Sequence, residues 1–239
     1  MVPALSSQLN FNIDNLLAAA KQRDAFLYAP QTAAGRGNPT ILTQVMSVVD
    51  RAIAEKGVDP QRVYLTGLSM GGGGVWNLLN LFPERIAATV PICGVSPTAG
   101  FDVEKLIDEP IWAFHGRRDT TVSVTVTRDV TGSFLLEAGL PAPTYPAPLT
   151  QGPQAQFAFS PLNLRYTEMS GAHGITPNVY STALNSQLYD WMFSQSQIPE
   201  PATFHLAVIT LCISVLGMRS SICRSRTRRQ NPASPLTAS

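Results

Sequence analysis

The sequence predicts an α/β fold in which a mostly parallel sheet is covered by helices on both faces. Short apolar runs alternate along the chain with stretches of helical period, an order typical of such sheets. The apolar runs are continuous rather than alternating, which indicates strands buried on both faces. The chain has 239 residues, 44% apolar and 14% charged, which suits one domain with an appendage.

In the first half of the chain, helical spacing and strand-like runs alternate clearly. Residues 13–21 and 40–56 carry apolar side chains at helical spacing. Gly57 and Pro60 end the second of these helices. The other elements expected in this half are strands at 25–29, 62–66 and 87–93 and a helix at 71–81.

The second half continues the same alternation. An apolar run at 110–115 predicts a strand, and residues 123–137 predict a helix that Gly139 and Pro141 stop. Residues rich in Pro, Gln and Ala then predict a loop or lid insertion. The insertion spans 141–163, the last strand is expected at 164–168, and the last helix at 177–193.

The pentapeptide Gly67-Leu68-Ser69-Met70-Gly71 lies between an expected strand and an expected helix. This strand, G-x-S-x-G, helix order is typical of a nucleophile elbow, where the serine sits on a sharp turn. Glycines around the turn let the two chain segments approach without Cβ clashes. We therefore predict Ser69 as a nucleophile and the backbone N–H of Met70 as a donor to an oxyanion.

A serine nucleophile needs a histidine base and an acid that orients it. His173, in the loop after the last expected strand, is the predicted base, and Asp119, in the loop after 110–115, is the predicted acid. The chain order Ser, Asp, His is the one expected for this elbow. His205 lies in an apolar tail, and His115 is expected to pack beside the site.

Other charged residues near these loops have plainer interpretations. Asp129 falls within an expected helix and is predicted to face solvent, and Glu168 is too close to His173 to be the first choice of acid. Arg117 and Arg118 either bind an anionic substrate group or belong to an ion-paired loop, and the second interpretation is favoured.

The stretches DPQRVYLTGLSMGGGGVWNLL, IWAFHGRRDTTV and SGAHGITPNVY resemble the phospholipase/carboxylesterase and "predicted peptidase" branch of the α/β-hydrolases. This branch neighbours the feruloyl esterases and the polyhydroxybutyrate depolymerases. The resemblance runs from about Asp24 to Phe193. It implies hydrolysis of a carboxylic ester through an acyl-enzyme on Ser69, with Asp119 and His173, and without a cofactor. A serine peptidase is the alternative within this class.

Hydrolases of this kind open with several strands and an H-G-x-G-like stretch whose loop supplies a second oxyanion donor. No such motif precedes Ser69 here. The sequence therefore predicts an α/β-hydrolase domain that lacks the N-terminal strands, with one assignable oxyanion donor, Met70. The alternative function is a catalytically impaired surface or binding protein on a hydrolase scaffold.

The C-terminal part of the chain has a different character. Pro199-Glu200-Pro201 precedes an apolar run at 204–218 and five arginines from Arg219 to Arg229. This pattern resembles a PEP-CTERM sorting signal, which implies an exosortase-type sorting enzyme as partner, export and a transient membrane anchor. The first residues carry no secretory signal. A buried C-terminal helix with a basic end is the alternative.

Three domains are therefore expected: a hydrolase domain at 1–197, a sorting segment at 198–230 and a disordered tail at 231–239. The formal net charge is +1 and the excess of arginine lies in the tail, so no nucleic-acid surface is predicted. Cys93 is expected to be a buried free thiol, and no metal-ligand spacing appears. The ester's pockets are expected at 94–109 and 141–163, where no specificity motif is evident.

Overall fold

Five strands form one sheet in the computed structural model, which describes residues 14–30, 37–183 and 185–197. Their order across the sheet is β1-β2-β3-β5-β4. The first four in this order are parallel, and β4 is antiparallel to β5. The strands are β1 (Tyr64–Leu68), β2 (Ala88–Ile92), β3 (Ile111–Gly116), β4 (Ala155–Phe159) and β5 (Leu164–Met169). The predicted α/β class is confirmed.

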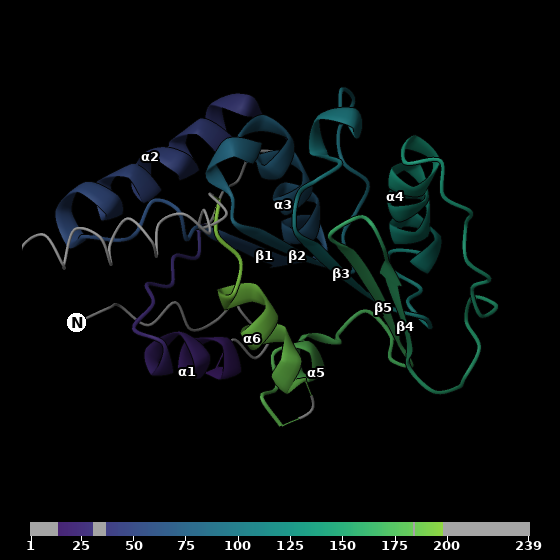
Figure 1. Cartoon of the computed structure of the whole chain (residues 1–239). Helices are drawn as coiled ribbons and strands as arrows, with labels where there is room; N and C mark the ends of the chain where they lie inside the picture. Colours follow the sequence, from purple (N-terminus) through teal and green to yellow (C-terminus); the bar gives the residue numbers. More distant parts are fainter. Residues whose placement is uncertain (1–13, 31–36, 184, 198–239) are drawn as a thin grey trace, which may run out of the picture. The chain divides into compact units, whose positions relative to one another are not determined.

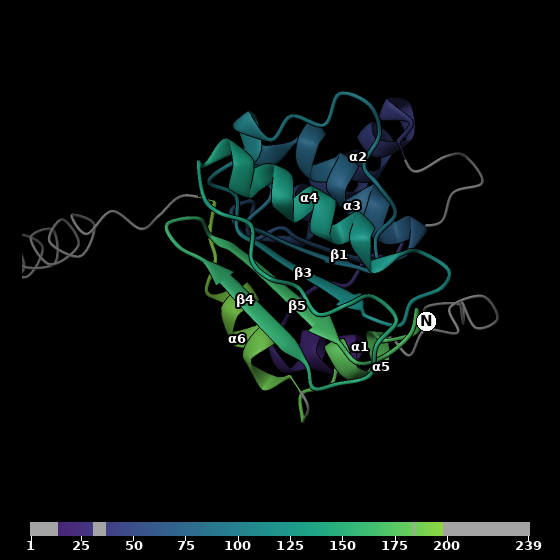
Figure 2. The same ribbon diagram turned by 90° about the vertical axis from the view of Figure 1, so that its right-hand side faces the viewer.

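Helices cover both faces of the sheet (Figures 1 and 2). One face carries α2 (Pro39–Lys56), α3 (Met70–Leu81) and α4 (Val124–Glu137). The opposite face carries α1 (Asp14–Gln22), α5 (Thr176–Val179) and α6 (Ser186–Phe193). Two short 3-10 helices lie in the connections, η1 (Pro83–Arg85) and η2 (Glu104–Leu106).

Strand β3 explains why the apolar runs of the sequence are continuous. Trp112 and Phe114 belong to the core under α5 and α6, whereas Ile111 and Ala113 belong to the core under α2, α3 and α4. Successive side chains of a strand point to opposite faces, so a strand covered on both sides can carry apolar residues in succession, as Ile111–Phe114 do. All six residues of β3 are buried.

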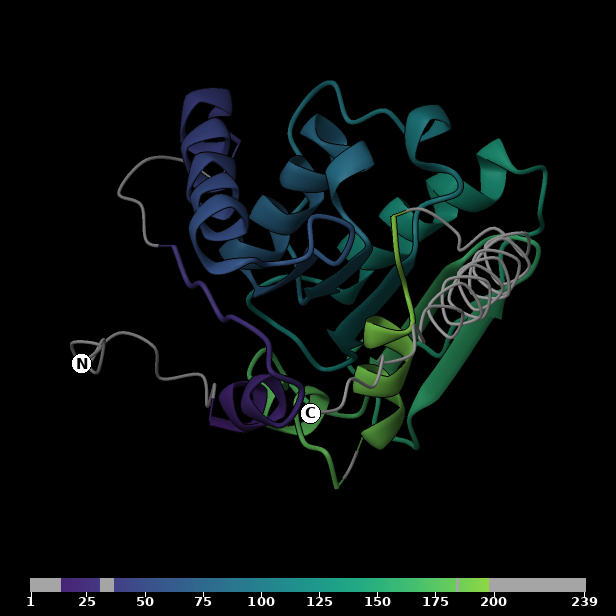
Figure 3. The ribbon, with the colours of Figure 1, turned by 60° about the vertical axis from the view of Figure 1, so that its left-hand side comes forward.

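Local sequence signals set the helix boundaries, and Gly57 ends α2 as predicted. Asn38 caps α2 because its side chain accepts from the backbone N–H of Thr40 at 2.9 Å, and Gly57 ends the helix in the left-handed conformation. Ser123 caps α4 by accepting from Thr125 at 3.3 Å. Figure 3 shows α1 and α6 on the same face, where Arg23 pairs with Asp190 at 3.0 Å.

The expected strand at 25–29 is wrong. Residues 25–30 form no ladder with any strand that the structure describes, and Phe26 and Tyr28 are 64% and 46% exposed. An apolar run becomes a strand only when a neighbouring strand accepts its backbone hydrogen bonds.

The expected loop at 141–163 is only partly correct, because it contains the edge strand β4. Alternate residues of this strand are exposed, whereas Phe157 and Phe159 pack against the core. The ring of Phe157 lies 6.0 Å from the ring of Tyr166 on β5. A half-exposed edge strand has a weaker sequence signal than a buried one, which is why the composition suggested a loop.

The last helix is not continuous as expected. Its range contains α5 and α6, separated by a turn that includes residue 184, which lies outside the described residues. Residues 1–13 and 198–239, with the expected sorting segment and tail, also lie outside them. Among the helices that are described, none is both long and apolar enough to cross a membrane.

Candidate active site

The predicted catalytic residues follow parallel strands whose carboxyl ends lie at one edge of the sheet. Leu68 is in register with Ile92 and Gly116 with Met169 at the ends of their strands. Open α/β sheets bind ligands at this edge, where the loops after the strands converge. Ser69 follows β1, and the loops after β3 and β5 carry Asp119 and His173.

Ser69 has the backbone geometry expected of a nucleophile elbow. Its φ is 58° and its ψ is −116°, a conformation that costs a residue with a side chain on the order of 1–3 kcal/mol. The N–H of Ser69 donates to Ile92 at 2.9 Å and its carbonyl accepts from Gly73 at 3.0 Å, so both sides of the turn are held. Its hydroxyl does not cap α3.

Met70 is the first residue of α3, and its side chain is exposed. The first N–H groups of a helix have no partner within the helix, and the helix dipole makes them a favourable site for negative charge. The backbone N–H of Met70 therefore has the chemistry required of an oxyanion donor. The role itself stays a prediction.

The glycines around the elbow are required at particular positions. A Cβ on Gly67 would lie 2.7 Å from the carbonyl carbon of Gly71, and a Cβ on Gly72 would lie 2.7 Å from the Cα of Gly94. A Cβ on Gly71 would meet nothing within 4 Å. The close packing of the chain segments around the elbow thus requires glycine at positions 67 and 72, whereas the sequence motif has its glycines at positions 67 and 71.

Asp119 and His173 are brought together from loops 54 residues apart: His173 Nδ1 and Asp119 Oδ2 are 2.6 Å apart. The other carboxylate oxygen accepts the N–H groups of Thr121 and Val122 at 2.8 and 2.9 Å. Burial raises the pKa of Asp119, but the hydrogen bonds from His173, Val122 and Thr121 outweigh burial, and the pKa is lowered overall. The carboxylate is therefore a charged acceptor for the imidazole.

The loop of His173 packs directly on the end of β3. Arg118 N–H donates to the carbonyl of Gly171 at 2.9 Å, and a Cβ on Gly116 would lie 2.1 Å from the carbonyl oxygen of Ala172. The side chain of His173 is 19% exposed. Because Asp119 occupies Nδ1, Nε2 is the nitrogen left for a serine proton, and a hydrogen bond between Ser69 and His173 stays a prediction.

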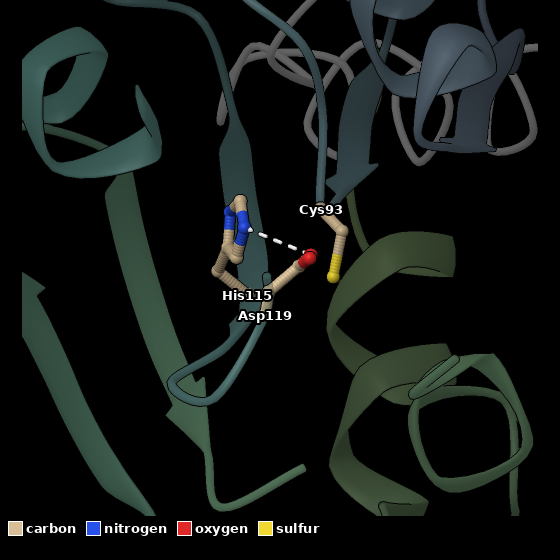
Figure 4. A group of neighbouring side chains, drawn as sticks. All are labelled: Cys93, His115 and Asp119. Atoms are coloured by element: carbon tan, nitrogen blue, oxygen red, sulfur yellow. Dashed lines mark ion pairs between the residues drawn. The ribbon is translucent and has the colours of Figure 1, made fainter. Parts of the chain in front are cut away.

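His115 packs beside the site, as predicted, and Figure 4 shows it next to Asp119. Its hydrogen-bond partners were not predicted. Its Nδ1 lies 2.7 Å from Thr127 Oγ1, and its Nε2 lies 2.9 Å from the carbonyl of Val122 and 3.3 Å from Asp119 Oδ2. Burial lowers the pKa of His115. The imidazole is therefore neutral, and its contact with Asp119 is not an ion pair.

Cys93, His115 and Asp119 also resemble a metal-binding group, since their ligand atoms all lie within 4.8 Å of one another. Their chemistry does not fit a metal ion. Both ring nitrogens of His115 already have protein partners. Burial raises the pKa of the Cys93 thiol, which keeps it protonated, whereas a metal requires the thiolate. Cys93 is a buried free thiol, as expected.

Glu168 belongs to a buried network that the sequence did not predict. Its side chain is fully buried and pairs with Arg117 at 3.3 Å and Arg128 at 2.6 Å, while Tyr166 donates to it at 3.0 Å. Arg117 is therefore ion-paired rather than open to a substrate. Arg118 is exposed and donates to the carbonyl of Ser170 at 2.8 Å.

Two surface hollows border the segments expected to form the substrate pockets. One, of about 470 Å³, lies against the loop of His173, and Gln154 from the 141–163 segment forms part of its wall. The other, of about 550 Å³, is lined by Gly100–Glu104 and by Ser133, Leu136 and Glu137.

Asp129 is exposed on α4, as predicted.

Comparison with known proteins relates the chain to hydrolases and esterases. Residues 18–137 match the Dienelactone hydrolase family. The bifunctional acetylxylan esterase/xylanase XynS20E of Neocallimastix patriciarum is 29% identical over 79 residues. These cover 33% of this chain and 12% of that protein, so the chain spans a small part of the curated relative's length.

Solved structures of esterases are also similar to this chain. A thermostable esterase is 31% identical with a TM-score of 0.49, covering 66% of this chain and 37% of that chain. The carboxylesterase of Bacillus cereus is 16% identical with a TM-score of 0.51, covering 76% of this chain and 84% of that chain. The second likeness supports the fold alone.

Proposed function

The chain belongs to the dienelactone hydrolase family, and from this premise we propose that it is a serine-dependent hydrolase of carboxylic esters. Ser69 is the nucleophile, His173 the general base and Asp119 the residue that orients the base. The backbone N–H of Met70 contributes to an oxyanion site. The family and the esterases among its relatives support an ester as substrate.

One observation carries the proposal. The 2.6 Å contact between Asp119 Oδ2 and His173 Nδ1 joins an acid and a base at the sheet edge where Ser69 holds a strained φ of 58°. A buried carboxylate fixes the tautomer of the imidazole and stabilises the imidazolium that forms during acyl transfer. Structural ion pairs are common elsewhere in proteins, but this pair lies in loops at the same edge of the sheet as the strained serine turn.

In the first half of the proposed reaction, Ser69 Oγ attacks the carbonyl carbon of the ester. His173 Nε2 takes the proton of the hydroxyl as the new carbon–oxygen bond forms. The N–H of Met70 donates to the oxyanion of the tetrahedral intermediate. His173 then returns the proton to the departing alkoxide oxygen, which leaves as the alcohol while the acyl group stays on Ser69.

In the second half, a water molecule replaces the alcohol. His173 Nε2 takes one proton from the water, whose oxygen attacks the acyl carbon. The proton passes to Ser69 Oγ as the acyl–oxygen bond breaks, and the free carboxylic acid leaves. Asp119 stays ionised throughout, because its role is to hold and stabilise His173.

A fluorophosphonate probe tests the nucleophile directly, because such probes label an activated serine. Wild-type protein is expected to be labelled and to hydrolyse p-nitrophenyl acetate, whereas Ser69→Ala loses both properties. Ser47→Ala is the matched control, since Ser47 lies on α2 and its hydroxyl donates to the carbonyl of Gln44. Equal labelling of wild type and Ser69→Ala contradicts the proposal, and turnover of peptide anilides in place of esters favours a peptidase.

The tail has a separate proposed role, which rests on its sequence alone. We propose that residues 198–230 are a PEP-CTERM-like sorting signal that an exosortase-type enzyme processes after export. Pro199-Glu200-Pro201 and the arginines from Arg219 to Arg229 support this reading. Mass spectrometry of the protein from its native cell tests it, since a mature chain that keeps residues 219–229 contradicts processing.

A further inference from the structure

His115 occupies a position that the proposed reaction does not use, yet it is fully buried against the predicted acid. Both ring nitrogens are engaged, Nδ1 with Thr127 Oγ1 at 2.7 Å and Nε2 with the carbonyl of Val122 at 2.9 Å. A carbonyl can only accept, so Nε2 carries the hydrogen and the hydroxyl of Thr127 donates to Nδ1. One neutral tautomer satisfies both partners.

The Val122 peptide links this imidazole to the acid. The carbonyl of Val122 accepts from His115, and the N–H of Val122 donates to Asp119 Oδ1 at 2.9 Å. His115 thus holds one end of the 119–122 turn, whose N–H groups bind the carboxylate. The opposite end of the turn follows Arg117 and Arg118, which connect it to the end of β3, and His115 itself lies on that strand.

The same imidazole edge also faces the other carboxylate oxygen. His115 Nε2 lies 3.3 Å from Asp119 Oδ2, which is the oxygen that His173 contacts at 2.6 Å. The two histidines therefore approach the same oxygen, His173 as the predicted base and His115 as a buried neutral group (Figure 4 shows His115 and Asp119). A neutral N–H edge stabilises the carboxylate without supplying a competing positive charge.

We propose that His115 is a positioning residue that fixes the Asp119 carboxylate toward His173, through the Val122 turn and through its own Nε2–H edge. This inference rests on the proposed function, because Asp119 matters for turnover only as the partner of a catalytic base. Thr127 contributes to the same positioning, since its hydroxyl donates to Nδ1 of His115 and so favours the tautomer with the hydrogen on Nε2. The Asp119 carboxylate is thus positioned by contacts at both of its oxygens before any substrate binds.

Substitutions that remove or restore the donor test the proposal in the full 239-residue chain. His115→Leu removes the donor and is expected to lower kcat about 10- to 100-fold, with KM changed less than about twofold. His115→Gln keeps an N–H near the position of Nε2 and is expected to recover most of the lost kcat. Thr89→Val is the matched control, because the Thr89 hydroxyl is buried and has no hydrogen-bond partner.

A second readout does not depend on turnover. An imidazole N–H that is strongly bound to a carboxylate gives a low-field proton NMR signal, which His173→Gln identifies by its loss. This signal is expected to be present in wild type and His115→Gln, and shifted or broadened in His115→Leu. If the NMR changes appear while wild type lacks turnover, the positioning role stands and the proposed function fails.

Three results overturn the proposal: wild-type kcat in folded His115→Leu, an equal loss of kcat in His115→Gln and His115→Leu, or an unchanged low-field signal in His115→Leu. If His115→Leu does not fold, Thr127→Val takes its place. That variant removes the donor to Nδ1 and is expected to lower kcat and broaden the signal. Wild-type values for both quantities in Thr127→Val overturn the proposal equally.

Discussion

Asp119 depends on donors from two sides, and this arrangement explains its charge. Two backbone N–H groups, from Thr121 and Val122, contact one oxygen, while His173 contacts the other at 2.6 Å. These bonds outweigh the effect of burial on its pKa. The buried carboxylate of Asp119 therefore stays ionised beside the imidazole of His173.

Replacing this carboxylate tests its proposed role at the residue scale. Asp119→Asn is expected to lower kcat by about 10⁴-fold, because an amide does not fix the imidazole in the productive tautomer. Asp129→Asn is the matched control, since Asp129 is exposed on α4. Its kcat should stay within about twofold of wild type. Steady-state kinetics on p-nitrophenyl acetate measure both, and equal values for the two variants contradict the assignment.

The buried His115 makes stability depend on pH in a defined direction. Burial lowers its pKa in the folded state, whereas in the unfolded chain it titrates near about pH 6.5. Below that pH the unfolded state binds a proton that the folded state does not, so the free energy of unfolding falls as pH falls. At higher pH this contribution is constant.

Asp119 adds to the same trend at lower pH. Its pKa is lowered in the folded state, so its stabilising contribution is present at neutral pH and is lost as pH falls below its ordinary value toward its folded value. Urea unfolding at pH 7.5 and 5.5 measures the contribution of His115 to stability, because the contribution of Asp119 changes only at lower pH. The loss of stability between these values should be smaller in His115→Gln than in wild type, and equal losses contradict the prediction.

At the scale of elements, the end of β3 and the loop after β5 are packed too closely for a side chain. A Cβ on Gly116 would lie 2.1 Å from the carbonyl oxygen of Ala172, the residue before His173. The glycine is thus required by the loop that carries the predicted base, although nothing in its own strand demands it.

Gly116→Ala is therefore expected to destabilise the fold by about 1–3 kcal/mol and to lower kcat by displacing the His173 loop. Gly132→Ala on α4 is the matched control, since its Cβ would meet nothing within 4 Å. That change should stabilise the protein by roughly 0.5–1 kcal/mol, because alanine is the better helix former. Urea unfolding and kinetics measure both, and a neutral Gly116→Ala rules out the steric argument.

At the scale of the whole hydrolase domain, Glu168 connects the sheet to the 141–154 segment. Arg128 binds Glu168 and the carbonyl of Pro146 at 2.7 Å, and Arg117 binds Glu168 and the carbonyl of Pro153 at 3.0 Å. One carboxylate thus anchors β5, the turn after β3, α4 and this segment together.

Glu168→Gln is expected to destabilise the domain by about 3–5 kcal/mol, because it removes the charge that both buried ion pairs share. Asp190→Asn is the control, since Asp190 is 76% exposed in its pair with Arg23. Its cost should stay below about 1 kcal/mol. Urea unfolding gives both values, and similar costs for the two variants contradict a structural role for the buried network.

Local patterns along the chain predicted most elements, since apolar period and capping residues act within a few positions. They identified the strands β1, β2, β3 and β5, the helices α1 to α4 and the elbow turn at Ser69, although β1 is only partly buried. They failed for residues 25–29 and for β4, because a strand depends on a partner that its own residues do not specify. The order Ser69, Asp119, His173 came from the motif and the sheet order it implies.

Tertiary structure alone decided which side chains meet. Asp119 and His173 are 54 positions apart, and they meet because the parallel strands β3 and β5 align their carboxyl ends. Glu168 and Arg128 are 40 positions apart, and they meet because α4 packs on the sheet. Packing between distant segments also requires Gly72 and Gly116 to lack side chains, because Gly94 lies against the first and Ala172 against the second. Sequence order established the kinds of element and the nucleophile turn, whereas contacts between distant segments arise from packing, which no local pattern encodes.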